Sequence, residues 1–235
     1  MERIFITGTN RGIGLEVTRQ YLQLDDTRIF ATARQPEVAT ELQALAATYP
    51  ERLTVIPLEV TDETAIREAA RLVAEQVDGL DILINNAAIN PPEKTQTLDG
   101  ITVETMLDVL RVNTAAPLMI VKALLGLLRQ GNNPRIANIS SEMGSLAART
   151  YGADYAYCTS KAALNMVTRG LAADLRRDTI TVIALDPGWV QTDMGSPDAD
   201  LTPQESARGI RSVIDGLTPA DSGAFLRWDG GSHPW

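Results

Sequence analysis

Short apolar runs alternate with amphipathic helical patterns along the whole chain. The apolar runs predict strands at Arg3–Thr7, Arg28–Ala33, Leu53–Leu58, Asp81–Ile84, Arg135–Ser140, Thr181–Leu185 and Ala224–Arg227. The helical patterns predict helices at Gly12–Leu24, Val38–Tyr49, Thr64–Gln76, Val103–Gln130 with a kink at Pro117, Tyr155–Arg176 and Pro203–Asp215. Strands separated by helices pair in parallel through right-handed crossovers. The pattern therefore predicts a Rossmann-type α/β fold, a doubly wound sheet of about seven strands with helices on both faces and a ligand crevice at the carboxyl ends of the strands.

One domain, residues 1–235, accounts for the chain, because no linker or repeat divides it and its apolar fraction of 44% is ordinary. We find no signal-peptide pattern and expect no apolar run of transmembrane length, which predicts a cytoplasmic protein without a membrane partner. The single cysteine and the single histidine, His233, argue against a disulfide, a metal site or a His-based triad, and His233 is expected to be a tail residue. A net charge of −9 argues against a nucleic-acid partner.

A glycine-rich turn joins the first predicted strand to the first helix, with the spacing G-x-x-x-G-x-G. Glycines permit a tight turn and close approach of the backbone to a pyrophosphate, and the helix N-terminus offers free N–H groups. No Lys-Ser/Thr pair follows, which excludes a P-loop. The turn predicts a dinucleotide site. Its candidate contacts are Gly8, Asn10, Arg11, Gly12, Ile13 and Gly14.

The residue after the second predicted strand indicates which dinucleotide is bound. An acidic residue there binds the ribose diol of NAD, whereas an arginine suits the 2′-phosphate of NADP. Arg34 occupies this position, and Arg11 provides a second cation. We therefore expect NADP(H), with NAD(H) less favoured.

Tyr157 and Lys161 are four residues apart in a predicted helix and therefore project from the same side. A cation about 4 Å from a phenol stabilises the phenolate by at most about 4 kcal/mol at an effective dielectric constant of about 20. We expect Lys161 to lower the pKa of Tyr157 toward neutrality, so that Tyr157 can act as a general acid or base. The pair alone is common on helices, and the other motifs give it weight.

These motifs occur in a characteristic order: Thr7–Gly14, Asn85-Asn86-Ala87, Asn113, Asn138-Ile139-Ser140-Ser141, Tyr157 to Lys161, and Pro187-Gly188. In this order they resemble the short-chain dehydrogenase/reductase family over the whole chain. Pro187–Met194 and the ending Trp228–Trp235 are similar to the sniffer and C-factor branch, which is related to carbonyl reductases.

The resemblance implies four catalytic residues. Tyr157 would give a proton to the carbonyl oxygen, Lys161 would hold the phenol's pKa down and bind the nicotinamide ribose, and Ser141 would donate to the developing oxyanion. Asn113 would position a water that links Lys161 to solvent. Adjacent strand residues face opposite ways, so only one of the two hydroxyls, that of Ser140 or that of Ser141, can share a pocket with Tyr157. The resemblance selects Ser141.

The resemblance also implies further cofactor contacts. Asn86 and Ala87 would line the adenosine ribose, and Glu59-Val60 stands where the family has Asp-Val, with the acid reaching the adenine. The nicotinamide end would be flanked by Pro187, Gly188, Val190 and Thr192. Two features depart from the family: Ala88 replaces a glycine, and Ser141 precedes Tyr157 by 16 residues, so we expect an insertion at Met143–Asp154 near the substrate mouth.

The function implied is NADPH-dependent reduction of small aldehyde, ketone or quinone carbonyls. Two alternatives remain open: a dinucleotide-binding signalling or sensor protein of the C-factor type, and an NAD-dependent alcohol dehydrogenase. Only about ten residues separate Thr192 from the last helix, which predicts a short lid and a broad, apolar or aromatic substrate range. A homodimer is expected through the helices Val103–Gln130 and Tyr155–Arg176. The apolar face of these helices at the dimer interface would consist of Leu118, Val121, Leu124, Leu125, Leu164, Val167 and Leu171.

Overall fold

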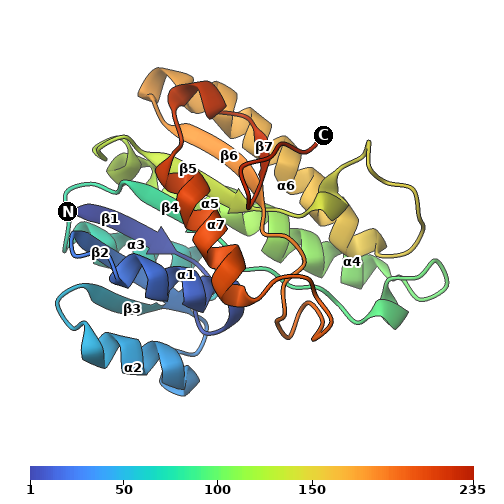
Figure 1. Cartoon of the computed structure of the whole chain (residues 1–235), viewed down its shortest axis with the longest axis horizontal. Coiled ribbons are helices and arrows are strands. Elements are labelled where there is room, and N and C mark those ends of the chain that lie inside the picture. The colour runs from blue at the N-terminus through green and yellow to red at the C-terminus, as the bar shows by residue number, and fades with distance from the viewer.

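Seven parallel strands form one sheet in the computed structural model, which describes residues 1–235 (Figure 1). The strand order is β3-β2-β1-β4-β5-β6-β7. The strands are β1 (Glu2–Ile6), β2 (Thr27–Ala33), β3 (Leu53–Pro57), β4 (Ile82–Asn85), β5 (Arg135–Ile139), β6 (Thr181–Asp186) and β7 (Phe225–Arg227). The Rossmann-type fold is therefore confirmed, and the strand bounds agree with the predicted ones to within one or two residues.

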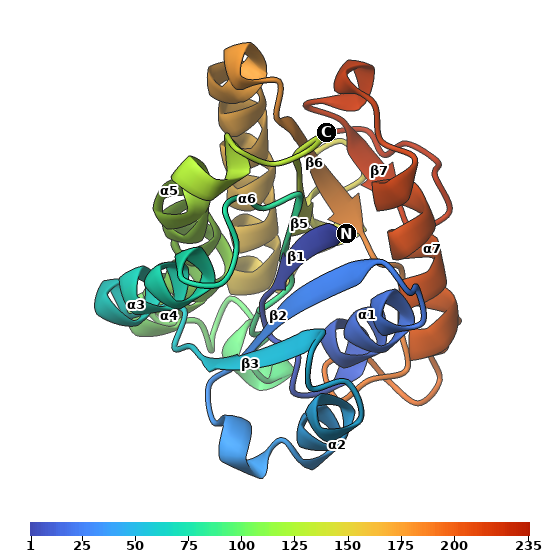
Figure 2. The same cartoon turned by 90° about the vertical axis from the view of Figure 1, so that its left-hand side faces the viewer.

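Helices cover both faces of the sheet (Figure 2). Helices α1 (Gly12–Leu22), α2 (Thr40–Thr48) and α7 (Pro203–Asp215) lie on one face, and α3 (Glu63–Ala74), α4 (Val103–Leu110), α5 (Ala116–Leu128) and α6 (Tyr155–Asp174) lie on the other. Side-chain caps fix the starts of two of these helices. The Asp62 carboxylate accepts hydrogen bonds from two backbone N–H groups at α3, and Thr202 with Glu205 forms a capping box at α7.

Two apolar clusters, one on each face of the sheet, explain why the strands are continuous hydrophobic runs in the sequence. In β1, Ile4 and Ile6 pack in the cluster with α1 and α7, whereas Phe5 packs in the cluster with α3 and α5. Successive strand residues point to opposite faces, and here both faces are buried. The ends of the strands are therefore the part of the sheet that remains open to a ligand.

The predicted helix Val103–Gln130 is interrupted directly before Pro117, the residue at which a kink was expected. A π turn, Arg111–Ala115, separates α4 from α5, and Pro117 lies in the first turn of α5. Proline has no N–H, and its ring crowds the carbonyl four residues earlier, which is that of Asn113. The wider π turn directly before Pro117 accommodates this, and it is where Asn113 lies.

The same segment corrects the expectation that no apolar run reaches transmembrane length. Val103–Leu128 spans 26 residues and is long and apolar enough to cross a membrane by length and composition alone. In the structure Ile120, Leu124 and Leu128 pack in the apolar cluster on the face of the sheet that α3 and α5 cover. The core helix of a globular domain meets the same criterion, because its inner face is apolar.

Several residues expected on a dimer face are instead part of this core. Val121, Leu124, Leu164 and Leu171 are buried within the monomer. Leu118, Leu125 and Val167 are only partly buried. The large apolar side chains that α4 and α6 do expose are Val103, Leu107, Tyr155 and Met166. The homodimer remains a prediction, with these residues in place of the four buried ones.

Candidate active site

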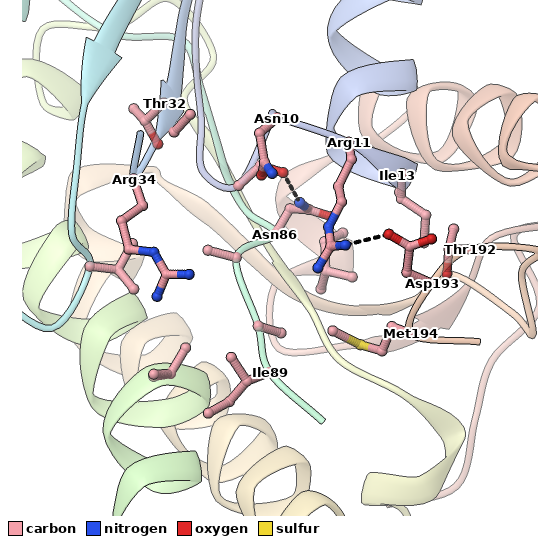
Figure 3. A pocket seen from close by; sticks show the side chains of 18 of the residues that line it. Asn10, Arg11, Ile13, Thr32, Arg34, Asn86, Ile89, Thr192, Asp193 and Met194 are labelled. Atoms are coloured by element: carbon pink, nitrogen blue, oxygen red, sulfur yellow. Dashed lines mark hydrogen bonds and ion pairs between the residues drawn. The ribbon is translucent and has the colours of Figure 1, made fainter. Parts of the chain in front are cut away.

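A cavity of about 640 Å³ lies at the carboxyl ends of the strands (Figure 3). The segments after β1, β2, β4, β5 and β6 all contribute to its wall. This is the position at which a doubly wound sheet binds its ligand. The cavity therefore gathers residues that are far apart in the sequence.

The glycine turn after β1 is packed too closely for larger residues. Gly8 has φ +70°, and a Cβ there would lie 2.8 Å from the Ala87 Cα. A Cβ on Gly14 would collide with the Gly8 carbonyl. The Asn86 Nδ2 donates to the carbonyls of Thr7 and Gly8, each at 3.0 Å. Asn86 thus holds the turn in shape, in addition to lining the cavity.

The start of α1 is open to an anion. Arg11 is the N-cap residue, but its side chain makes no capping bond, so no side chain occupies the first N–H groups of the helix. Gly12, the first helical residue, has φ +59° and lines the cavity. The buried Thr32 Oγ1, on the opposite wall, has no hydrogen-bond partner. Free N–H groups and an unpaired hydroxyl are what a bound dinucleotide would satisfy.

Two arginines line the cavity (Figure 3), and each is paired with an acid. Arg11 forms an ion pair with Asp193, and the Arg34 Nη1 lies 3.8 Å from the Glu59 Oε2. Both pairs are exposed to solvent, with the Arg34 side chain 78% exposed. Exposed pairs contribute little free energy, about 0–1 kcal/mol, so an incoming phosphate can replace the acids.

Tyr157 lies in the first turns of α6 at the inner end of the cavity. Its phenol lies near the Ser141 side chain, and its backbone N–H donates to the Gln96 Oε1 at 3.0 Å. Lys161, one turn later, is 2% exposed and donates from its Nζ to the Ile139 carbonyl at 2.8 Å. The helix therefore directs both side chains toward the same cavity, as their spacing predicted.

The expected lowering of the Tyr157 pKa is wrong. Burial raises the pKa of Tyr157 above its ordinary value, and the hydrogen bond with Ser141 offsets only part of the increase. The Lys161 ammonium bonds to the Ile139 carbonyl and lies 5.5 Å from the centroid of the Tyr157 ring. Burial also lowers the pKa of Lys161 to about 8, against an opposing effect of the Asp186 carboxylate.

The two serines after β5 face different surroundings. The Ser140 Oγ is buried and donates to the Asn165 Oδ1 at 2.6 Å, whereas the Ser141 side chain lies near the Tyr157 phenol and lowers its pKa. The Ser141 Oγ also accepts from the Met143 N–H at 3.2 Å and caps the short turn after it. Ser140 lines the cavity and Ser141 does not, but the Ser140 hydroxyl is already engaged with Asn165.

Asn113 is buried rather than facing solvent. Its Oδ1 accepts from the Ile89 N–H at 2.9 Å, and its Nδ2 donates to the Ile89 carbonyl at 2.9 Å and to the Ser160 Oγ at 3.0 Å. Both amide hydrogens are thus used. Asn113 ties the segment after β4 to α6, one residue from Lys161, and the water relay implied by the resemblance stays a prediction.

Most of the predicted cofactor residues line the cavity. They are Gly8, Asn10, Arg11, Gly12, Ile13, Arg34, Glu59, Val60, Asn86, Ala87, Tyr157, Lys161, Pro187 and Thr192. Gly14, Gly188 and Val190 do not line it, and neither do Asn113 and Ser141. The first three instead shape its wall, since a Cβ on Gly188 would lie 2.6 Å from the Leu201 Cδ1 and Val190 forms a bridge with Leu201.

The segment between Ser141 and Tyr157 is irregular, as the expected insertion at Met143–Asp154 requires. After a 3-10 turn at Glu142–Gly144, the chain reaches α6 through Ala153 and Asp154, which have φ +62° and +50°. Left-handed backbone at two non-glycine residues costs free energy and fixes the entry to the helix.

Lining residues such as Thr32, Asp193 and Met194 were not predicted, and neither were two residues that support the site from behind its lining. Gln96 holds the start of α6 through the Tyr157 N–H, and Asp186 ends β6 beside Pro187. No motif marks Gln96. Asp186 could have been found as the acidic residue at the end of a strand that enters the crevice.

Known proteins similar to this chain cover most or all of it. A family model described as short chain dehydrogenase matches residues 2–201. C-signal of Myxococcus xanthus is 46% identical over 156 residues, which are 66% of this chain and 93% of that protein. The NADPH-bound carbonyl reductase from chicken fatty liver is 40% identical, with a TM-score of 0.94 over 100% of this chain and 99% of that one. Carbonyl reductase Sniffer of D. melanogaster is 33% identical, with a TM-score of 0.94 over 100% of both chains.

Proposed function

The chain belongs to the short-chain dehydrogenase/reductase family and is an NAD(P)-dependent oxidoreductase, and from this premise we propose that it reduces aldehyde, ketone or quinone carbonyls with NADPH. The observation that carries the proposal is that Tyr157 and Lys161 line the same cavity as the glycine turn and Arg34. A proton donor and a dinucleotide site thus meet in one space. The solved structures of similar carbonyl reductases, one of them bound to NADPH, support this function.

The residues of the cavity fit a dinucleotide. Gly8 and Gly14 allow the turn to pack closely against Ala87 and on itself, and the first turn of α1 offers its N–H groups to a pyrophosphate. Arg34 and Arg11 would bind the 2′-phosphate, replacing their present partners Glu59 and Asp193. When bound, NADPH supplies the hydride.

Tyr157 would donate the proton to the carbonyl oxygen. Because burial raises its pKa, the phenol holds its proton at neutral pH, which is the state that a reduction needs. The Ser141 hydroxyl, whose proximity to the phenol offsets part of this increase, would donate to the same oxygen as charge develops on it. Lys161 would place a buried positive charge next to this pair and bind the nicotinamide ribose.

The mouth of the cavity favours apolar carbonyls. Ile89 and Met194 line it and are 38% and 45% exposed. The loop that follows Val190 is short and closed at its base, where the Gln191 N–H donates to the Leu201 carbonyl at 2.9 Å. Such a loop cannot enclose a bulky ligand, so we expect weak discrimination among substrates, about 1–3 kcal/mol per methylene at most.

The test is NADPH oxidation followed at 340 nm over a panel of aldehydes, ketones and quinones, with NADH in parallel. We expect turnover with several apolar or aromatic carbonyls and a preference for NADPH. The variant Tyr157→Phe should lose at least about 100-fold in kcat while its Kd for NADPH stays within a few fold, because the hydroxyl acts on the substrate.

Three outcomes would contradict the proposal. NADPH binding without turnover of any carbonyl would favour a sensor protein, an alternative that the similarity to C-signal supports. A clear preference for NAD with alcohols would favour a dehydrogenase. Near-normal kcat in Tyr157→Phe would remove Tyr157 from the mechanism.

A further inference from the structure

A largely buried histidine–aspartate contact lies directly behind the cavity wall and is not explained by the catalytic residues. The His233 Nε2 and the Asp186 Oδ2 are 2.9 Å apart, and their side chains are only 12% and 8% exposed. Asp186 is the last residue of β6, and His233 belongs to the segment that follows β7. The pair was not expected, because the sequence indicated that His233 is a free tail residue.

Each atom of the Asp186 carboxylate has its own partner. While Oδ2 faces His233, Oδ1 accepts from the Gly188 N–H at 3.2 Å. Gly188 has φ +77° and closes the turn that places Pro187 in the cavity wall. The orientation of the carboxylate thus determines the shape of this turn.

His233 is itself held in place by β7. Its backbone N–H donates to the Phe225 carbonyl at 2.8 Å, and its ring lies 4.8 Å from the Phe225 ring, centroid to centroid. Trp235 stacks on the same Phe225 ring at 5.3 Å, and its carbonyl accepts from the Ala147 N–H at 3.0 Å. The segment after β7 therefore joins β7 to the irregular segment after Ser141, and His233 is fixed between them.

The pair also faces the catalytic side of the cavity. The Asp186 carboxylate acts electrostatically on both Lys161 and Tyr157. Moving it would change the charge around both residues as well as the turn at Gly188. A histidine that fixes this carboxylate is therefore well placed to influence the nicotinamide half of the site.

We infer that His233 is a positioning residue for the nicotinamide half of the cofactor site. Its Nε2 fixes the Asp186 carboxylate, which in turn holds the Gly188 N–H and the wall at Pro187. The adenosine half, built by the glycine turn and Arg34, does not depend on His233. This inference rests on the proposed function, which supplies a nicotinamide cofactor for the site.

The experiment compares two substitutions at one position. His233→Leu keeps the bulk but removes the polar atom, whereas His233→Gln keeps a donor close to the position of the histidine Nε2. For each protein the Kd for NADPH is measured by fluorescence, and the Kd for adenosine 2′,5′-bisphosphate, which lacks a nicotinamide, is measured by calorimetry. If His233→Leu does not fold, His233→Asn, whose shorter amide cannot reach Asp186 in the same way, takes its place.

We expect His233→Leu to raise the Kd for NADPH about tenfold, since a hydrogen bond to a buried charge is lost. Its Kd for the bisphosphate should stay within about twofold, and His233→Gln should stay within about threefold of the original protein for both ligands. The inference is overturned if His233→Leu leaves the Kd for NADPH unchanged, if it weakens both ligands equally, or if His233→Gln loses as much as His233→Leu. An original protein that binds neither ligand would instead overturn the proposed function.

Discussion

At the scale of single residues, two adjacent hydroxyls offer the sharpest comparison in the molecule. The Ser140 Oγ donates to Asn165 in the interior, whereas the Ser141 side chain lies near the Tyr157 phenol. We predict that Ser141→Ala lowers kcat about a hundred- to a thousandfold at unchanged NADPH affinity, the cost of removing a preorganised donor to an oxyanion. Steady-state kinetics and NADPH titration would measure both quantities.

Ser140→Ala is the matched control. It should keep kcat within about tenfold, but it leaves the Asn165 Oδ1 without its donor and should lower the free energy of unfolding by about 1–3 kcal/mol. If the losses in kcat were exchanged between the two variants, the catalytic hydroxyl would be that of Ser140.

Cofactor preference is the second prediction at this scale. Arg34→Asp replaces a cation at the cavity with an anion beside Glu59. A charge-assisted contact with the 2′-phosphate contributes about 1.5–3 kcal/mol, so the Kd for NADPH should rise ten- to a hundredfold while that for NADH changes little. Titration of both cofactors tests this, with Arg67→Asp on α3 as the control. Equal changes in the Kd values for NADPH and NADH would show that Arg34 does not bind the 2′-phosphate.

The sequence identified the residue types of the site but not their environments. Glycine spacing and the Tyr157–Lys161 pair are local patterns, and they predicted which residues meet in the cavity. The direction of the Tyr157 pKa shift was wrong because it depends on burial and on the Ile139 carbonyl that binds Lys161. Gln96, Asp186 and His233 act through partners 61, 2 and 47 residues away, and no local pattern marks the two long-range contacts.

At the scale of elements, one carboxylate joins the amino ends of the central strands. Asp81, just before β4, accepts from the Arg3 backbone N–H at 2.7 Å and from the Arg3 Nη2 at 2.6 Å. It also accepts from the Asn132 N–H at 2.5 Å, in the turn that leads into β5. Three segments of the sheet are thus held by one side chain.

We predict that Asp81→Asn lowers the free energy of unfolding by about 1.5–3 kcal/mol at neutral pH. Burial alone would raise the pKa of Asp81, but the hydrogen bonds from Arg3 and Asn132 outweigh it, and the pKa is lowered. A carboxyl group with a lowered folded-state pKa stabilises the fold above its unfolded pKa of about 3.9 and ceases to do so as the pH falls through the folded value.

Urea unfolding at pH 7 and in acid measures this difference between Asp81→Asn and the original protein. The difference should narrow below about pH 4. Asp108→Asn, at an exposed pair with Arg111, is the control and should change stability by less than about 1 kcal/mol. A difference for Asp81→Asn that is independent of pH would show that its charge is not involved.

Elements with strong periodicity were predicted almost to the residue, as β1 and α7 show. The π turn at Arg111–Ala115 was not predicted, because a hydrogen-bond shift of one residue inside a helix leaves the apolar pattern nearly unchanged. Pro117 is the only residue in the sequence that indicates a disturbance of this helix, and it was interpreted as a kink.

At the scale of the whole molecule, we predict a homodimer formed through α4 and α6. Leu107 and Met166 are 53% and 73% exposed, and a shallow hollow between these helices is lined by Leu110, Leu118 and Val167. Light scattering at micromolar concentration should give twice the 25.4 kDa of the chain. The double variant Leu107→Glu/Met166→Glu should be monomeric, while Leu98→Glu, on an exposed loop, should not change the mass. A monomeric mass for the original protein would contradict the prediction.

The strand order also has a consequence for how the protein is made. β1 lies at the centre of the sheet between β2 and β4, yet Ile4 pairs with Ile82, far along the chain. At about 5–20 residues per second, a ribosome adds that stretch in about 4–16 seconds. Once β3 ends at Pro57 and until β4 is made, the nascent sheet of β1, β2 and β3 has an apolar edge strand, β1, that lacks its partner. This interval is when the chain most needs a chaperone, and slowing translation before β4 should increase aggregation of the newly made protein.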